Sequence, residues 1–228
     1  MTPSSRFVLG IDTAARLGSI ALAMDGSAVV WESLPPGEHS SGISLAGERI
    51  LKSRSLGWGE LAGIAVSEGP GSFTGLRIGL AWAKGICMGS GVKLALVSEH
   101  EASAWIHRLE AAVIATVLPG ERGHAQAALW AGGEALRLLW GPESVPEMEA
   151  WEALRAHRPA VISGPGLKPE ALEMIRDSGL RLLGPGDKPA ATAVAELGDA
   201  KLLAGEFADL ALAAPSYGRA PNARKPAR

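Results

Sequence analysis

The sequence has 228 residues, enough for one large domain or two lobes of about 100 residues each. Its residues are 47% apolar and 20% charged, as in an ordinary globular protein, and the net charge of −2 excludes an overall positive field that would attract nucleic acid. The single cysteine, Cys87, excludes an intrachain disulfide. Because the start lacks the apolar stretch of a secretory signal, we expect a cytoplasmic protein that makes no contact with membranes.

The first half of the chain is predicted to be a mixed α/β unit. A buried strand over 7–11 ends at Asp12, and the Asp25-Gly26 dipeptide is typical of a hairpin turn between the next two strands. The predicted elements are strands over 7–11, 19–24, 28–32, 63–66 and 94–97, with helices after Ser41, over 73–88 and over 99–109.

The second half is predicted to repeat this order. The predicted elements are strands over 113–118, 125–130, 135–140, 160–162 and 180–183, with helices over 147–157, 169–178 and 190–203. Because the two series agree, we expect a duplicated unit with a mixed sheet in each lobe. The predicted division is an N-terminal lobe over 1–110, a C-terminal lobe over 111–205, and a C-terminal segment over 206–228.

A glycine-rich turn precedes the long helix that starts near Phe73. Glycine there permits backbone angles that other residues resist, proline stiffens the turn, and a hydroxyl side chain can cap the helix. Exposed N–H groups at such a turn can bind an anion, but the P-loop spacing is missing, so a tight capped turn is the alternative. The predicted turn residues are Gly69, Pro70, Gly71, Ser72, Thr74 and Gly75.

The long helix itself carries small residues at Gly75, Gly79, Ala83 and Gly85. Because each glycine inside a helix costs about 1 kcal/mol relative to alanine, we expect another backbone to approach this face closely. The approaching segment could come from the same lobe or from a second chain. Leu76, Leu80, Ala83 and Cys87 also form an apolar stripe typical of a core helix, and both interpretations can hold.

The stretch G-P-G-S-F-T-G-L-R-I-G-L-A-x-A-K-G from Gly69 to Gly85, preceded by L-G-I-D-T-A from Leu9, resembles the bacterial TsaB (YeaZ) family. The resemblance is strong from Phe7 to about Ala102, and in the second half it depends on strand order and length. It implies an α/β actin-like ATPase fold (ASKHA, ribonuclease H-like) with two similar lobes, each of a mixed sheet and helices. It also implies a role in forming threonylcarbamoyladenosine in tRNA.

The family's catalytic relative, TsaD, has an H-x-x-x-H metal pair, whereas here Ala104 stands four residues after His100. We therefore interpret His100 as a surface or helix-start residue and predict no metal site and no enzymatic activity. Asp12 and Thr13 occupy the place of a residual nucleotide contact, but Pro119 replaces the aspartate expected in the second half. The chain is predicted to require no cofactor. Whether a nucleotide binds at the partner interface stays open.

The resemblance further implies that the chain binds TsaD through the helix after Ser40 and the helix after the glycine turn. TsaE, a small ATPase, would dock on the pair, a homodimer would use the same surface, and tRNA would be reached indirectly through the complex. The predicted interface residues are Ile43, Gly47, Ile50, Leu51, Leu76, Gly79, Leu80 and Ala83. The predicted function is a non-catalytic partner of TsaD, with a homodimeric binding protein or a small phosphotransferase of the same fold as alternatives.

The end of the sequence is basic. After Asp209 there is no acidic residue, and the positive side chains there are Arg219, Arg224, Lys225 and Arg228. A solvated tail and a weak RNA-contacting arm both fit this composition. Tyr217-Gly218-Arg219 resembles a Y-L-R ending of the family, and whether this segment returns to the first lobe stays open.

Overall fold

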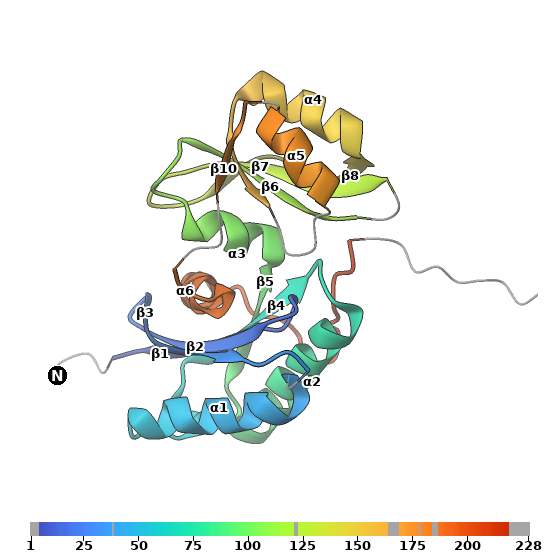
Figure 1. The fold of residues 1–228 in the computed structure, drawn as a ribbon. Coiled ribbons are helices and arrows are strands. Elements are labelled where there is room, and N and C mark those ends of the chain that lie inside the picture. The colour runs from blue at the N-terminus through green and yellow to red at the C-terminus, as the bar shows by residue number, and fades with distance from the viewer. Residues whose placement is uncertain are drawn as a thin grey trace, which may run out of the picture.

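The computed structural model describes residues 5–37, 39–120, 123–163, 169–177, 179–183 and 187–218. Its helices and strands follow one another in two similar series (Figure 1). The first series is β1 (Phe7–Asp12), β2 (Gly18–Met24), β3 (Ser27–Leu34), α1 (His39–Ser53), the 3-10 helix η1 (Trp58–Glu60), β4 (Gly63–Gly69), α2 (Phe73–Ser90), β5 (Lys93–Ser98) and α3 (Glu99–Ile106). The second is β6 (Val113–Pro119), β7 (His124–Ala131), β8 (Arg137–Pro146), α4 (Glu147–His157), β9 (Ala160–Ser163), α5 (Pro169–Asp177), β10 (Arg181–Leu183) and α6 (Ala190–Leu203).

The two sheets have the same strand order. The first is β3-β2-β1-β4-β5 and the second, in corresponding order, is β8-β7-β6-β9-β10. In each, the first strand pairs antiparallel with its hairpin partner and parallel with the strand that follows the first crossover helix. The predicted duplication and the mixed sheet in each lobe are therefore confirmed.

Two helices lie between the sheets and the others cover the outer faces (Figure 1). α1 and α2 cover the outer side of the first sheet, and α4 and α5 cover that of the second. α6 packs across β1, β2 and β4 of the first sheet, and α3 contacts both α6 and β6 of the second lobe. The last helix of the segment 111–205, which was predicted as the C-terminal lobe, therefore packs on the N-terminal lobe.

Apolar strands buried on both sides build the core of the first lobe. Leu9 and Ile11 of β1, Ile64 and Val66 of β4, and Leu94 of β5 belong to one buried cluster beneath α1 and α2. On the other side, α6 approaches the sheet so closely that a Cβ at Gly10 would lie 2.4 Å from the Ala195 nitrogen. This tight packing fixes the carboxyl ends of β1, β4 and β5 relative to the second lobe.

Several predicted boundaries differ from those of the structure, and two elements show the physical reason. The strand predicted over 135–140 runs from Arg137 to Pro146, because Gly141, with φ of 80°, and register shifts against β7 let it bulge and continue pairing. The helix predicted over 99–109 ends at Ile106, and the chain then turns so that the Arg108 carbonyl accepts a hydrogen bond from the Gly133 nitrogen, at 2.7 Å.

The segment after α6 returns to the first lobe. The Ala208 nitrogen donates to the Leu94 carbonyl at 2.7 Å, and the Ser216 nitrogen donates to the Glu68 carbonyl at 2.7 Å. At the end of the segment, the Gln126 side-chain amide of β7 donates to the Gly218 carbonyl at 2.5 Å. Residues 206–218 thus contact both lobes, whereas the basic residues from Arg219 onward lie outside the described residues.

Within the described ranges, the search for a helix long and apolar enough to cross a lipid bilayer found none.

Candidate functional site

The turn between β1 and β2 packs directly against the glycine face of α2. Cβ atoms at Gly75 and Gly79 would lie 2.0 Å from the Thr13 carbonyl oxygen and 2.2 Å from the Thr13 hydroxyl oxygen. A Cβ at Gly71 would lie 2.7 Å from Ala14. The Thr13 hydroxyl donates to the Gly75 carbonyl at 2.8 Å. The close approach predicted from the helical glycines therefore exists, and the approaching segment belongs to the same lobe.

The glycine-rich turn before α2 is a capped turn whose residues contact the chain's own backbone. Ser72 is the N-cap: its hydroxyl accepts from the Gly75 nitrogen at 3.2 Å, and its own nitrogen donates to the Ala14 carbonyl at 2.8 Å. Gly69 has a φ of 119°, and a Cβ there would lie 2.1 Å from the Ser216 carbonyl oxygen. Pro70 is partly buried, and Thr74 is exposed and is not the cap.

Two buried carboxyl groups lie beside this turn, where β1, β4 and β5 end. Asp12 is 1% exposed and Glu99 is 3% exposed. The Ser67 hydroxyl donates to a Glu99 carboxylate oxygen at 2.8 Å. Burial raises the pKa of Asp12, against the lowering effects of hydrogen bonds from Ala14 and Ser67. Burial and the Asp12 charge raise the pKa of Glu99.

His100 lies in the first turn of α3, but its interpretation as a surface residue is wrong. Its side chain is 1% exposed because the second lobe covers it. The Nδ1 atom is 2.8 Å from the Thr116 hydroxyl, which also accepts from the Trp130 indole at 3.1 Å. Burial lowers the pKa of His100 to about 4, so the ring is neutral at pH 7.

The described residues contain no group of three or more His, Cys, Asp or Glu side chains placed to hold a metal ion. Ala104, where TsaD would have its second histidine, is fully buried in the core beside β6. One neutral imidazole and a pair of carboxyl groups already hydrogen-bonded within the chain do not form a tetrahedral or octahedral ligand set.

Asp12 and Thr13, the predicted nucleotide-contact residues, make their contacts within the chain itself. An Asp12 carboxylate oxygen accepts from the Ala14 nitrogen at 2.9 Å, which closes the turn after β1, and Thr13 is fully buried. Pro119 ends β6 in the second lobe. Glu121 and the Gly164-Pro165-Gly166 segment lie outside the described residues.

A cavity of about 390 Å³ lies between the lobes. Its polar lining comes from Glu68, Ser98 and His100 of the first lobe and Gln126 and Ser144 of the second. None of the ten described residues that line it is Lys or Arg, so this part of its wall carries no positive side chain to neutralise a phosphate group. This lining does not favour a nucleotide.

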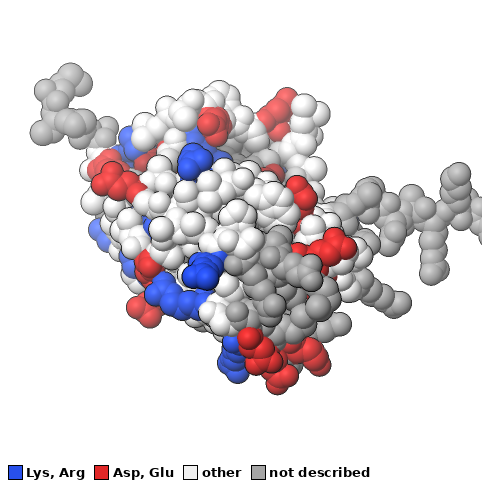
Figure 2. Space-filling view, turned by 90° about the horizontal axis from the view of Figure 1, so that it is seen from above, with Lys and Arg blue, Asp and Glu red and all other residues white. Residues whose placement is uncertain are grey.

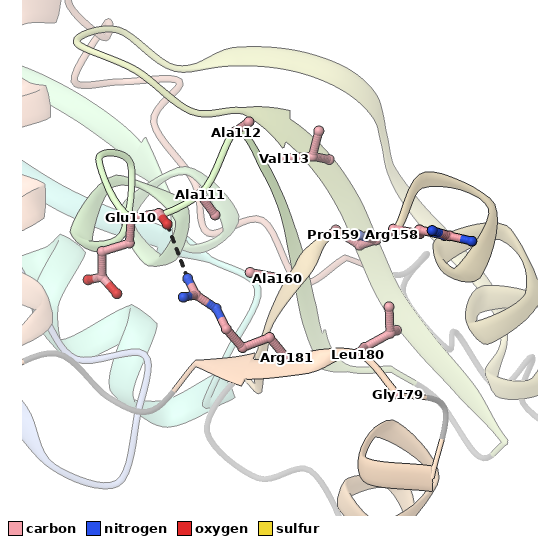
Figure 3. A pocket seen from close by; sticks show the side chains of 10 residues that line it. All are labelled: Glu110, Ala111, Ala112, Val113, Arg158, Pro159, Ala160, Gly179, Leu180 and Arg181. Atoms are coloured by element: carbon pink, nitrogen blue, oxygen red, sulfur yellow. Dashed lines mark hydrogen bonds between the residues drawn. The ribbon is translucent and has the colours of Figure 1, made fainter.

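A second hollow, of about 680 Å³, lies at the amino ends of β6, β9 and β10 (Figure 3). It contains two arginines that the sequence analysis did not single out. Arg181 reaches toward the first lobe and donates to the Glu110 carbonyl at 3.1 Å, while Arg158 extends the opposite way, toward α4 (Figure 3). Two cations that diverge in this way cannot hold one anion together.

The eight predicted interface residues are all buried inside the first lobe. Gly47, for example, lies under the rings of Trp58 and Trp82, and a Cβ there would be 2.9 Å from the first of them. The others pack beneath the sheet or against Thr13: Ile43, Ile50, Leu51, Leu76, Gly79, Leu80 and Ala83. The prediction that these residues contact a partner directly therefore does not fit the structure, because side chains and backbone of their own lobe cover them.

The outer faces of the same two helices are exposed, and the predicted interface residues did not include them. Leu45 of α1 is 57% exposed and Met88 of α2 is 75% exposed. Ala81 and Gly85 of α2 are exposed as well, and a Cβ at Gly85 would have no atom within 4 Å. Their four-residue spacing places Ala81 and Gly85 on one helical face, which is the sequence signal that could have identified it.

Comparison with known sequences finds relatives that match part of the chain. The model of the TsaD family, tRNA N6-adenosine threonylcarbamoyltransferase, matches residues 36–137. The tRNA threonylcarbamoyladenosine biosynthesis protein TsaB of Escherichia coli is 36% identical over 91 residues, which are 40% of this chain and 39% of that protein. The tRNA N6-adenosine threonylcarbamoyltransferase of Cereibacter sphaeroides is 36% identical over 105 residues, 45% of this chain and 29% of that protein. The chain thus spans about two fifths or less of these relatives.

Comparison with solved structures covers nearly the whole chain. A Pseudomonas aeruginosa protein described as similar to the peptidase YeaZ superposes with a TM-score of 0.78 and 19% identity, over 94% of this chain and all of that one. A ROK hexokinase from Thermus thermophilus superposes with a TM-score of 0.54 and 13% identity, over 88% of this chain and all of that one. These likenesses show the actin-like ATPase fold in both lobes.

Proposed function

We propose that the chain is a member of the TsaB (YeaZ) family and a non-catalytic partner of a TsaD threonylcarbamoyltransferase in forming N6-threonylcarbamoyladenosine in tRNA. The observation that carries this proposal is the match of this chain to both TsaB and TsaD proteins, combined with Ala104 in place of a second metal-binding histidine. In this proposal TsaE docks on the pair, and tRNA is reached through the complex.

The exposed face of α1 and α2 supports a helix-to-helix contact with TsaD. Leu45 and Met88 provide apolar area, and Ala81 and Gly85 leave room for another helix to come close. The buried interface residues of the sequence analysis then contribute indirectly, because they fix the positions of α1 and α2. A second copy of the chain would use the same face, so the homodimer competes with the complex.

The alternative function, a small phosphotransferase of the same fold, has less support. The turn after β1 is closed by a hydrogen bond to Asp12, Thr13 is buried, and no described residue that lines the cavity between the lobes is basic. We propose that no cofactor is required, and that any nucleotide in the complex is held largely by the partner.

A threonylcarbamoyl transfer assay tests the function. TsaD, TsaE, the threonylcarbamoyl adenylate donor and unmodified tRNA are combined with and without the chain, and the modified nucleoside is quantified. We expect modification only when the chain is present. Equal modification in both reactions would remove the partner role, and magnesium-dependent ATP hydrolysis by the pure chain would favour the phosphotransferase.

Replacing Gly85 by leucine is expected to weaken the complex with TsaD at least tenfold. The leucine fits the monomer, because no atom lies within 4 Å of the new Cβ, but it projects from the face where a second helix would approach. Affinity is measured by calorimetry, and thermal unfolding checks the fold. Ala156→Leu, on an exposed position of α4 in the other lobe, is the matched control and should bind normally. Unchanged affinity of Gly85→Leu would place the TsaD contact elsewhere.

A further inference from the structure

The cavity between the lobes has a polar lining that the proposed function does not use. Its volume of about 390 Å³ is far larger than the roughly 30 Å³ that one molecule takes in liquid water, and it falls within the range of small-molecule sites, about 300–1,000 Å³. The lining comes from the ends of β4 and β5, from β7 and β8, and from the segment after α6. Small ligands bind preferentially where such separate parts of a chain meet.

One buried polar atom of this lining has no hydrogen-bond partner. The His100 side chain is 1% exposed, and its Nε2 atom has neither a donor nor an acceptor among the described residues. Its other ring nitrogen, Nδ1, is directed at Thr116 of β6. A buried polar atom without a partner is costly, and native proteins retain few of them. We therefore expect Nε2 to meet a partner that the chain itself does not supply.

The hydrogen bonds around His100 indicate which ring nitrogen carries the proton. Burial lowers the pKa of His100 to about 4, so at pH 7 the ring is neutral and holds one proton. The Thr116 hydroxyl accepts from the Trp130 indole, and within the described part of the chain His100 Nδ1 is the acceptor for the hydroxyl proton, at 2.8 Å. With Nδ1 as an acceptor, the ring proton is on Nε2, which is then a donor without an acceptor.

An acceptor without a donor belongs to the same lining. Gln126 is 6% exposed, its amide nitrogen donates to the Gly218 carbonyl at 2.5 Å, and its amide oxygen accepts from no described residue. Among the described lining residues Glu68 alone has an acidic or basic side chain besides the neutral His100, and burial raises the pKa of its carboxyl group. Charged side chains of both signs stand instead on the outer surface, as Figure 2 shows for one face. A ligand for this lining therefore needs an acceptor, a donor and no negative charge.

We propose that the cavity binds a small uncharged molecule that carries a carboxamide group. The carbonyl oxygen of the ligand accepts from His100 Nε2, and its N–H donates to the Gln126 amide oxygen, so one planar group satisfies both atoms. A carboxylate of the same shape has no N–H to donate, and its charge would be desolvated near Glu68. The site goes beyond the proposed function and does not depend on it, since α1 and α2 cover the opposite side of the first sheet (Figure 1).

Titration of the intact chain with N-acetylglycinamide tests this site. Nuclear magnetic resonance of the imidazole nitrogens should first show the proton of His100 on Nε2, and the signals of this ring should then shift as the probe saturates. N-acetylglycine has the same shape but ends in a carboxylate. We expect it to bind at least about tenfold more weakly, because its charge would lose water without gaining a partner.

Two substitutions of His100 separate its two ring nitrogens. In His100→Asn the side-chain oxygen can still accept from Thr116, but the donor at the position of Nε2 is lost, so the probe should bind about tenfold more weakly. In His100→Gln the side-chain nitrogen reaches the position of Nε2 and should restore most of the affinity. His157→Asn, exposed at the end of α4, is the control and should bind normally. Thermal unfolding checks that each variant folds.

Several outcomes would overturn the carboxamide site, and the unsubstituted chain alone can give three of them. Absence of saturation would mean that the cavity holds solvent only, and equal affinity for the two probes would reject the carboxamide class. Saturation without a shift of the His100 signals would place the probe elsewhere. None of these results bears on the transfer assay, so failure of this site and failure of the partner role are distinguishable.

Discussion

Gly75→Ala is expected to destabilise the protein by about 3 kcal/mol. The new methyl group would lie 2.0 Å from the Thr13 carbonyl oxygen, which is backbone and cannot swing aside. Overpacking of this kind costs about 1–3 kcal/mol, and moving the turn also breaks the buried bond from the Thr13 hydroxyl to Gly75, worth about 1 kcal/mol more. Urea unfolding followed by circular dichroism measures the difference.

The same helix supplies the matched controls. Gly85 and Gly89 also lie inside α2, but a Cβ at either position would have no atom within 4 Å. Alanine there should stabilise the protein by about 0.5–1 kcal/mol, through helix propensity alone. If Gly75→Ala unfolded at the native urea concentration, the close contact between the β1–β2 turn and α2 would be wrong.

The order of secondary structure could be predicted because each element has a clear local pattern. Apolar runs marked the central strands, the Asp25-Gly26 turn marked the first hairpin, and the helices over 147–157 and 190–203 were predicted with the bounds that the structure has. Repetition of the series then predicted two similar lobes without any knowledge of contacts between them.

The proposed partner surface could not be predicted because the buried and exposed faces of α2 have similar residue types. Glycine and alanine occur on the buried side at Gly79 and Ala83 and on the exposed side at Ala81 and Gly85. The helical glycines therefore predicted a close approach but not the segment that makes it. A bulky residue at Gly79 would accordingly disturb Thr13 first, and any partner complex only through the lobe.

The site between the lobes depends on residues distant in the sequence. His100 is buried against the second lobe, where its ring contacts Thr116, 16 residues later, and Thr116 in turn accepts a hydrogen bond from Trp130. Asp12 and Glu99 come together only because β1, β4 and β5 are neighbours in the sheet. Local sequence patterns do not encode such contacts, which explains why His100 was wrongly placed at the surface.

Stability is expected to fall as pH rises from about 6.5 to 8.5, and Glu99→Gln is expected to remove most of this fall. The pKa values of Asp12 and Glu99 are raised in the folded state. The contribution of these two groups to the free energy of unfolding is therefore fully present below their unfolded pKa values, near 4, and is lost as pH rises through their folded pKa values. The His100 pKa, lowered to about 4, has the opposite effect, but only up to its ordinary value near 6.5.

Above pH 6.5 the carboxyl groups of Asp12 and Glu99 therefore dominate the pH dependence of stability. The Cys87 thiol, with its pKa raised by burial to about 11, titrates at higher pH. Glutamine at position 99 still accepts the Ser67 hydroxyl but carries no charge beside Asp12, so the free energy of unfolding at pH 8.5 should rise by about 1–2 kcal/mol. Urea unfolding at half-unit pH steps measures the slope, with Glu48→Gln on the exposed side of α1 as the control. A slope as steep in Glu99→Gln as in the native protein would mean that Glu99 is already ionised without cost in the folded state.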